Sequence, residues 1–341
     1  PYRMLPAKTY FTLETGNDKF HSERGMPNVL TYESFLRTYS PEGIWPQSDQ
    51  WGMHDYTLEG AQGATSFNEI IATGYGQPES AKEFADLAQW VNYDGHRSLF
   101  ESRSKHRMGL LMWMSHSCWP SMVWQTYDYY FEPTAAYFAI KKASEPLHIQ
   151  WNPATDEVEV VNYSAGLHPG LKARVQVLNM DASVAWEKEA TVDSREDTTE
   201  KCIKLQFPDA LSEVHFIKLT LEENEKIVSE NFYHRSKVEN NYQALKQLPK
   251  VPVRAQTQYT KADDGEWQAE ITVENRSSAP ALMVRLNIVG DKDGLQFLPI
   301  FYSDNYFALL PGETKVVRVH WKDVDTRGNA PLLKVSGYNV E

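Results

Sequence analysis

The chain has 341 residues, of which 41% are hydrophobic, and a formal net charge of −12. This length predicts two or three domains, and the apolar fraction is high enough to fill their cores, which excludes a disordered chain. The acidic balance argues against a nucleic-acid partner, because phosphate backbones are bound by clustered Lys and Arg. No run of eighteen apolar residues occurs, so we expect no membrane span.

Cysteine usage and the first residues add little about the compartment. Cys118 and Cys202 are the two cysteines, too few for a disulfide framework or a four-ligand zinc site, and we expect buried or free thiols. The histidines lack the spacing of metal ligands, so we expect neither a metal nor another cofactor. The chain begins with Pro1-Tyr2 instead of Met, which favours a fragment or a processed product.

The first part of the chain, residues 1–146, is mixed α/β in pattern. Apolar residues at helical spacing predict a long helix from Ala81 to Arg107, which Gly109 would end. An apolar run without alternation follows, from Leu110 to Met114, and predicts a strand buried on both faces. A helix followed by a buried strand is typical of a parallel barrel.

The second part changes in pattern from about residue 147. Short, often alternating strands separated by turn residues predict an antiparallel sandwich over 147–236. A polar stretch over 237–252, with Pro249 and Pro252, is interpreted as a linker. A second series of strands over 253–341 predicts another sandwich.

Glu23 is the first candidate for chemistry. It lies in Phe20-His21-Ser22-Glu23-Arg24-Gly25, among small and aromatic residues, a pattern that suits the exposed end of a barrel strand. The neighbouring Arg24 is expected to keep the carboxylate ionised, as a nucleophile requires. From these residues alone a surface salt bridge explains the pattern at least equally well.

The wider sequence around Glu23 resembles glycoside hydrolase family 2. Pro1-Tyr2 with Leu5-Pro6, then the Ser22-Glu23 pair, then Glu33-Ser34 with Arg37, are similar to the segment that carries this family's nucleophile. The likeness is strongest to the branch of exo-β-D-glucosaminidases, β-mannosidases and plant endo-β-mannosidases. It implies that Glu23 is the nucleophile at the end of the seventh barrel strand, with Glu14 as a lower-ranked alternative.

Later motifs extend the resemblance in the right order. Trp113 to Pro120 is similar to the last barrel strand and its loop, in which Trp113 would line the sugar subsite. His116 stands where many relatives carry Asn. Ser303 to Phe307 with Leu310-Pro311-Gly312-Glu313 is similar to the hallmark of the terminal immunoglobulin-like domain. The remaining candidates for substrate binding are His54, Asp55, Trp119 and Asp128.

The resemblance implies a fold and an activity. The fold would be the C-terminal part of a (β/α)8 barrel followed by two immunoglobulin-like β-sandwiches. The activity would be that of a retaining exo-β-glycosidase acting on a β-mannoside, a β-glucosaminide or a related sugar, with the acid/base Glu and the rest of the barrel upstream. A periplasmic or secreted location is expected from the family. The alternative is a non-catalytic module that binds carbohydrate or acts as a scaffold.

Overall fold

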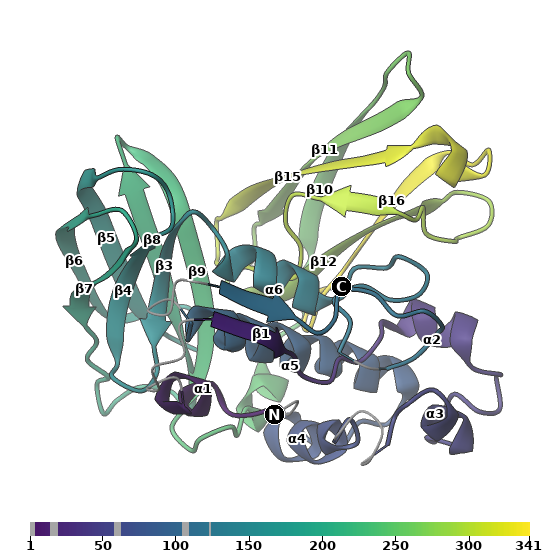
Figure 1. Ribbon diagram of the computed structural model, residues 1–341, viewed down its shortest axis with the longest axis horizontal. Coiled ribbons are helices and arrows are strands. Elements are labelled where there is room, and N and C mark those ends of the chain that lie inside the picture. Colours follow the sequence, from purple (N-terminus) through teal and green to yellow (C-terminus); the bar gives the residue numbers. More distant parts are fainter. Residues whose placement is uncertain (1–3, 14–19, 58–62, 104–108, 123) are drawn as a thin grey trace.

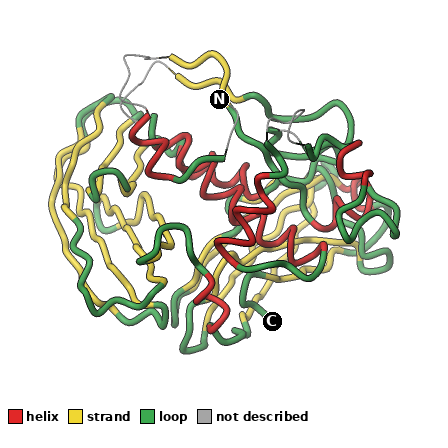
Figure 2. Tube along the Cα trace, turned by 90° about the horizontal axis from the view of Figure 1, so that it is seen from below, coloured by secondary structure: helices red, strands yellow, loops and turns green. Residues whose placement is uncertain are grey.

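The computed structural model describes residues 4–13, 20–57, 63–103, 109–122 and 124–341. Figure 1 shows a mainly helical part, here called the central part, with the first β-sandwich to its left and the terminal β-sandwich above it, and Figure 2 shows the same three parts from below. No helix among these residues is long and apolar enough to cross a membrane. The elements of the central part are α1 (Ala7–Leu13), β1 (Phe20–Arg24), α2 (Tyr32–Thr38), α3 (Asp49–Met53), α4 (Ser66–Tyr75), α5 (Ala81–Glu101), β2 (Gly109–Met112) and α6 (Ala135–Ala143).

Helix α5 is the axis of the central part. It starts at Ser80, whose side chain accepts a hydrogen bond from the Glu83 backbone N–H and so satisfies an N–H that the helix leaves unpaired. Its apolar side, including the fully buried Phe84 and Ala88, packs into the central core. The helix ends at Glu101, before the expected Arg107, and Ser102 and Arg103 form a turn. Residues 104–108 lie outside the described part.

Strands β1 and β2 form a parallel pair, although helices α2 to α5 separate them in sequence. Phe20 pairs with Gly109 and Arg24 with Met112, with an irregular register between His21 and Arg24. The expected burial of β2 on both faces is wrong: its residues are half-buried, and Leu111 is 55% exposed. The reason is that, among the described residues, β1 is the one strand paired with β2.

The first sandwich packs two antiparallel sheets, ordered β3-β4-β7 and β6-β5-β8-β9. Apolar side chains that alternate along these strands, such as Ile149, Val160 and Leu219, fill the space between the sheets. Its strands are β3 (Leu147–Asn152), β4 (Glu157–Asn162), β5 (His168–Asn179), β6 (Val184–Ser194), β7 (Thr198–Lys204), β8 (Val214–Glu223) and β9 (Lys226–Ser236).

The terminal sandwich consists of sheets β10-β11-β15-β13 and β14-β12-β16, with Ile271, Leu286 and Trp321 in its core. The segment expected to be a linker, 237–252, is packed: it contains η1 (Gln243–Gln247), and Leu245 is fully buried in the central core. The strands are β10 (Val253–Lys261), β11 (Glu266–Asn275), β12 (Ala281–Gly290), β13 (Ile300–Tyr302), β14 (Phe307–Leu309), β15 (Thr314–Lys322) and β16 (Pro331–Ser336), with η2 (Asp323–Thr326) after β15.

A buried polar cluster joins α5 to the first sandwich. Glu101 Oε1 accepts hydrogen bonds from Asn231 at 2.8 Å and Tyr233 at 2.9 Å, and lies 3.0 Å from His148 Nε2. The other ring nitrogen of His148 lies 3.0 Å from Glu145 Oε2. Burial opposes the charge of His148, but its bonds to the two carboxylates outweigh this and raise its pKa. Burial likewise opposes the charge of Glu145, but His148 and Lys142 lower its pKa to about 2.

Glu145→Gln is expected to destabilise the protein most between about pH 5 and 6. The lowered pKa of Glu145 contributes stability that is present above about 4.5 and lost as the pH falls toward 2, and the raised pKa of His148 contributes stability that is lost as the pH rises through it. We expect a loss on the order of 2 kcal/mol at pH 5.5, measured by urea unfolding. Exposed Glu187→Gln is the control; a loss for Glu145→Gln that is constant from pH 3 to 9 would contradict this account.

Candidate active site

Glu23 lies in β1 with its side chain exposed, whereas the next residue, Arg24, is buried. The irregular register between His21 and Arg24 lets both Ser22 and Glu23 reach solvent, as local bulges re-aim side chains in strands. The Arg24 guanidinium lies 5.9 Å from the centre of the Tyr10 ring. Arg24 therefore turns inward, toward α1, and its expected role in keeping the Glu23 carboxylate ionised stays a prediction.

Trp113 follows β2 and lies beside the end of β1. Its backbone N–H donates to the Arg24 carbonyl at 2.8 Å, and its peptide bond to Met114 is cis. A Cβ added to Gly25 would lie 1.9 Å from the Trp113 carbonyl oxygen. The two backbone segments therefore approach each other here more closely than a side chain allows. Glycine at position 25 thus sets the spacing between the two segments that carry Glu23 and Trp113.

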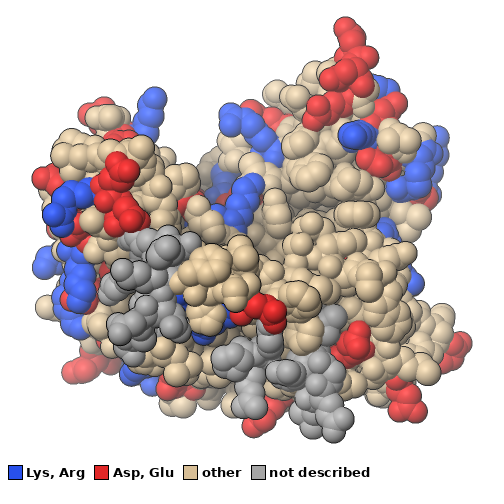
Figure 3. Space-filling model, viewed as in Figure 1, with Lys and Arg blue, Asp and Glu red and all other residues tan. Residues whose placement is uncertain are grey.

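The surface around the two parallel strands exposes apolar side chains. The side chain of Phe20 is 47% exposed and that of Trp113 is 45% exposed. Rings exposed to this degree can contact a ligand or another polypeptide segment. In Figure 3 the charged side chains gather on the two sandwiches, and the middle of this face has few of them. A face of this kind suits a sugar ring, whose apolar side stacks on aromatic side chains.

Three of the predicted substrate-binding residues form one cluster. The rings of His54 and Trp119 are stacked with centroids 5.0 Å apart, and the Trp119 side chain lies near the Asp55 carboxylate. His54 Nδ1 lies 2.5 Å from the Pro120 carbonyl. Partial burial raises the pKa of Asp55, against the lowering effects of His54 and Trp119. The loop after α3 and the loop after β2 are thus joined, and Trp119 remains 43% exposed.

The other predicted residues have different surroundings. His116 is half-buried, stacked on Phe131 at 4.8 Å. Asp128 is buried: Oδ1 accepts from the backbone N–H groups of Tyr130 and Glu132, and Oδ2 accepts from the Ser34 hydroxyl. Burial raises the pKa of Asp128. Both carboxylate oxygens of Asp128 already accept hydrogen bonds within the protein. This geometry suits a residue that holds the loop after β2 in place better than one that contacts a sugar. Glu14 lies outside the described residues.

A second charged group near these loops was missed by sequence reasoning. Arg285, in β12 of the terminal sandwich, donates to both oxygens of Glu33 at 3.1 and 2.9 Å and to Glu132 Oε1 at 2.8 Å. Burial raises the pKa of Glu132 to about 7. Burial also opposes the charge of Glu33, but the neighbouring Arg285 outweighs this and lowers the pKa of Glu33. These residues are far apart in sequence, and no spacing pattern links them. Glu33 alone was noticed, as part of a motif.

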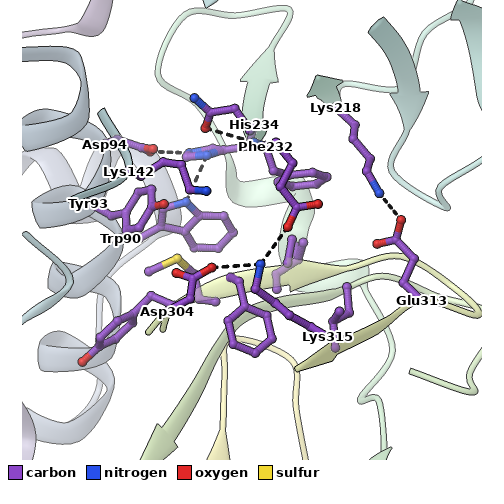
Figure 4. Close-up of a pocket in the computed structure, with 18 of the residues that line it drawn as sticks. Trp90, Tyr93, Asp94, Lys142, Lys218, Phe232, His234, Asp304, Glu313 and Lys315 are labelled. Carbon is purple, nitrogen blue, oxygen red and sulfur yellow. Dashed lines mark hydrogen bonds and ion pairs between the residues drawn. The ribbon is translucent and has the colours of Figure 1, made fainter. Parts of the chain in front are cut away.

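Two cavities among the described residues are lined by other groups than Glu23 and Trp113. One, of about 480 Å³, lies between α1, α4, α5 and the first sandwich. The other, of about 230 Å³, lies where α5 meets both sandwiches (Figure 4). There Lys315 pairs with Glu230 at 2.7 Å and Asp304 at 2.8 Å, and Lys218 pairs with Glu313. The pairs Lys315–Glu230 and Lys218–Glu313 join the two sandwiches across the junction, whereas Asp304 lies in the same sandwich as Lys315.

No metal centre is visible in the part of the chain that the structure describes, since no three of its His, Cys, Asp and Glu side chains are grouped to hold an ion. Cys118 and Cys202 are both free thiols, as expected.

Comparison with known proteins decides the family. The model of the exo-β-D-glucosaminidase Ig-fold domain matches residues 231–340, which confirms an immunoglobulin-like fold for the terminal part. An exo-β-D-glucosaminidase of Streptomyces avermitilis is 30% identical over 378 aligned residues, covering 100% of this chain. The chain belongs to the exo-β-D-glucosaminidase and β-mannosidase branch of glycoside hydrolase family 2. It spans 42% of the length of the Streptomyces relative.

Three other proteins are similar over almost the whole of this chain, at lower identity. A mannosylglycoprotein endo-β-mannosidase of Lilium longiflorum is 24% identical over 99% of this chain and 43% of its own length. The exo-chitosanase CsxA of Amycolatopsis orientalis has the same fold, with a TM-score of 0.88 and 24% identity over 100% of this chain and 44% of that one. A β-D-mannosidase of Dictyoglomus thermophilum aligns with a TM-score of 0.75 and 20% identity, over 99% of this chain and 39% of that one.

Proposed function

We propose that this chain supplies the nucleophile and part of the sugar subsite of a retaining exo-β-glycosidase, with Glu23 as the nucleophile. The observation that supports this most is the pairing of β1 with β2, which brings an exposed carboxylate and an exposed indole to neighbouring strand ends. In parallel barrels the active site is formed at the carboxyl ends of the strands. The two strands and their helices are, in this proposal, the last part of such a barrel.

The chemistry follows the double displacement of retaining enzymes. A second carboxyl group about 5–5.5 Å from the nucleophile protonates the leaving oxygen while Glu23 attacks the anomeric carbon and forms a glycosyl-enzyme. Water, activated by the same second carboxylate, then releases the sugar with its original configuration. We place this acid/base on a barrel strand upstream of residue 1, so the chain alone is expected to show no turnover. A periplasmic or secreted location stays a prediction.

The substrate class proposed first is a β-D-glucosaminide, with a β-mannoside second. The support is the Streptomyces exo-β-D-glucosaminidase, the relative matched at 30% identity, while the endo-β-mannosidase of Lilium is matched at 24%. The complete enzyme that contains this chain should therefore be screened on aryl β-glycosides of glucosamine, mannose, galactose and glucuronic acid. A preference for galactosides or glucuronides would contradict this substrate class.

Covalent labelling tests the proposed nucleophile directly. A fluorinated β-glycoside that slows hydrolysis of the glycosyl-enzyme is expected to add one sugar to the peptide that contains Glu23, because the intermediate is an ester of the nucleophile. Mass spectrometry of the digested enzyme locates the label. A label on the peptide of Glu14 would move the role to that residue, and sugar binding without any label would favour a non-catalytic carbohydrate module.

A further inference from the structure

We infer that the terminal sandwich sets the position of the two loops that form the candidate site, and that Arg285 is the positioning residue that joins them. This inference rests on the proposed function for its consequence in catalysis. The first loop runs from Gly25 to α2 and follows the strand of Glu23; the second follows β2 and carries Trp113, His116 and Trp119. Arg285 comes from β12, in the other half of the molecule.

The contacts of Arg285 reach both loops at once. One arm of its guanidinium binds both oxygens of Glu33, in the first turn of α2, and the other binds Glu132, at the end of the loop after β2. Two neighbours in the terminal sandwich repeat the pattern: Asn287 lies 3.4 Å from Glu33, and Gln296 bonds Glu132 Oε2. The terminal sandwich therefore binds each loop by a charged and an amide side chain.

The two loops are also bound to each other at the same place. The Ser34 hydroxyl, in α2, donates to Asp128, and the Tyr130 hydroxyl donates to the Arg37 carbonyl at 3.1 Å. Asp128 also accepts a hydrogen bond from the backbone N–H of Glu132 at 3.0 Å. The residue whose carboxylate Arg285 binds is therefore bonded directly to the residue that joins the two loops. A shift of Glu33 relative to Glu132 would break these bonds together.

Cohesion alone does not account for a buried cation with two carboxylates. Removing a guanidinium and its carboxyl partners from water costs about as much as their attraction returns, and apolar residues of similar volume stabilise such an interface as well or better. What the guanidinium adds is direction: its planar fork fixes two carboxylates at set positions, which neither Lys nor an apolar side chain does. The arrangement is therefore suited to positioning, and an error of about 1 Å in a catalytic group can cost on the order of 100-fold in rate.

The test compares three variants in the complete enzyme that contains this chain. Arg285→Met keeps most of the volume and removes the fork, Arg285→Lys keeps the charge, and Arg318→Met removes an 80% exposed arginine of the same sandwich as the matched control. Hydrogen exchange of peptides 26–38 and 124–134 reports the loops without requiring any activity, and steady-state kinetics on the preferred aryl β-glycoside reports the site.

We expect Arg285→Met to speed exchange in both peptides and to lower kcat about 10- to 100-fold, with KM changed much less, because misplacement affects the reacting groups. Arg285→Lys is expected to fall between this variant and the wild type, and Arg318→Met to match the wild type. Exchange in the two peptides unchanged within about twofold, or accelerated equally over the whole terminal sandwich, would overturn the inference. A wild-type enzyme without glycosidase activity would instead refute the proposed function, and the exchange data would still decide whether Arg285 positions the loops.

Discussion

Replacing Glu23 by Gln is expected to lower kcat of the complete enzyme on an aryl β-glycoside by on the order of 10⁴-fold or more. The amide has nearly the same shape as the carboxylate but cannot form the glycosyl-enzyme, and loss of a nucleophile removes the step on which the whole pathway depends. The exposed position of Glu23 in β1 means that the substitution removes no internal contact of the strand, so the fold should be retained.

The control for this prediction is Glu33→Gln, because Glu33 belongs to the same motif but is occupied by Arg285. We expect a smaller loss of kcat for Glu33→Gln, because this change shifts the position of α2 but removes no reacting group. A second measurement uses Glu23→Ala with azide, a small anion that can take the place of the missing carboxylate and yields a glycosyl azide of inverted configuration. Glu23→Gln with at least a tenth of wild-type kcat would exclude Glu23 as the nucleophile.

Gly25→Ala is expected to have the largest effect of any single methyl group in the central part. The added Cβ would lie 1.9 Å from the Trp113 carbonyl oxygen, and the obstacle is backbone, which cannot rotate away. β1 and the segment after β2 must therefore separate, which breaks the 2.8 Å hydrogen bond from the Trp113 N–H to the Arg24 carbonyl. We expect a loss of about 3 kcal/mol in the free energy of unfolding, from overpacking and the lost bond together.

Urea unfolding measures this loss, and the matched control is Gly52→Ala in α3. There the added Cβ meets Thr57 at an ordinary 3.8 Å, so alanine should be neutral or slightly stabilising. We also expect Gly25→Ala to lower kcat more than its effect on stability explains, because Glu23 and Trp113 would be displaced from each other. Equal stability of the two alanine variants would show that the two segments have room to move.

Local chemistry was readable from the sequence in this protein. The alternation of apolar residues predicts two sandwiches, because burial between two sheets requires a period of two. The helical spacing after Ala81 likewise predicts α5, although the helix ends at Glu101 and not at the expected Arg107. The motifs around Glu23 and Trp113 pointed to glycoside hydrolase family 2, and the comparisons confirm that family.

The tertiary structure alone decided which side chains meet. Ser22 and Glu23 are adjacent in β1 and would alternate in a regular strand, yet both are exposed where the register is irregular. Asp128 was expected at the sugar, but its oxygens are taken by Ser34 and two backbone N–H groups. Arg285 reaches Glu33 across 252 positions of sequence, and such contacts depend on packing between domains, which no local pattern of residues records.

The proposed assignment of chemistry therefore depends on one parallel pairing, that of β1 with β2, which brings the backbone segments of Glu23 and Trp113 to the same strand ends. The sequence by itself identified Glu23 and Trp113 as candidates, because each lies in a recognisable motif. Their proximity is a property of the fold, because the intervening helices must first pack before residues 23 and 113 become neighbours.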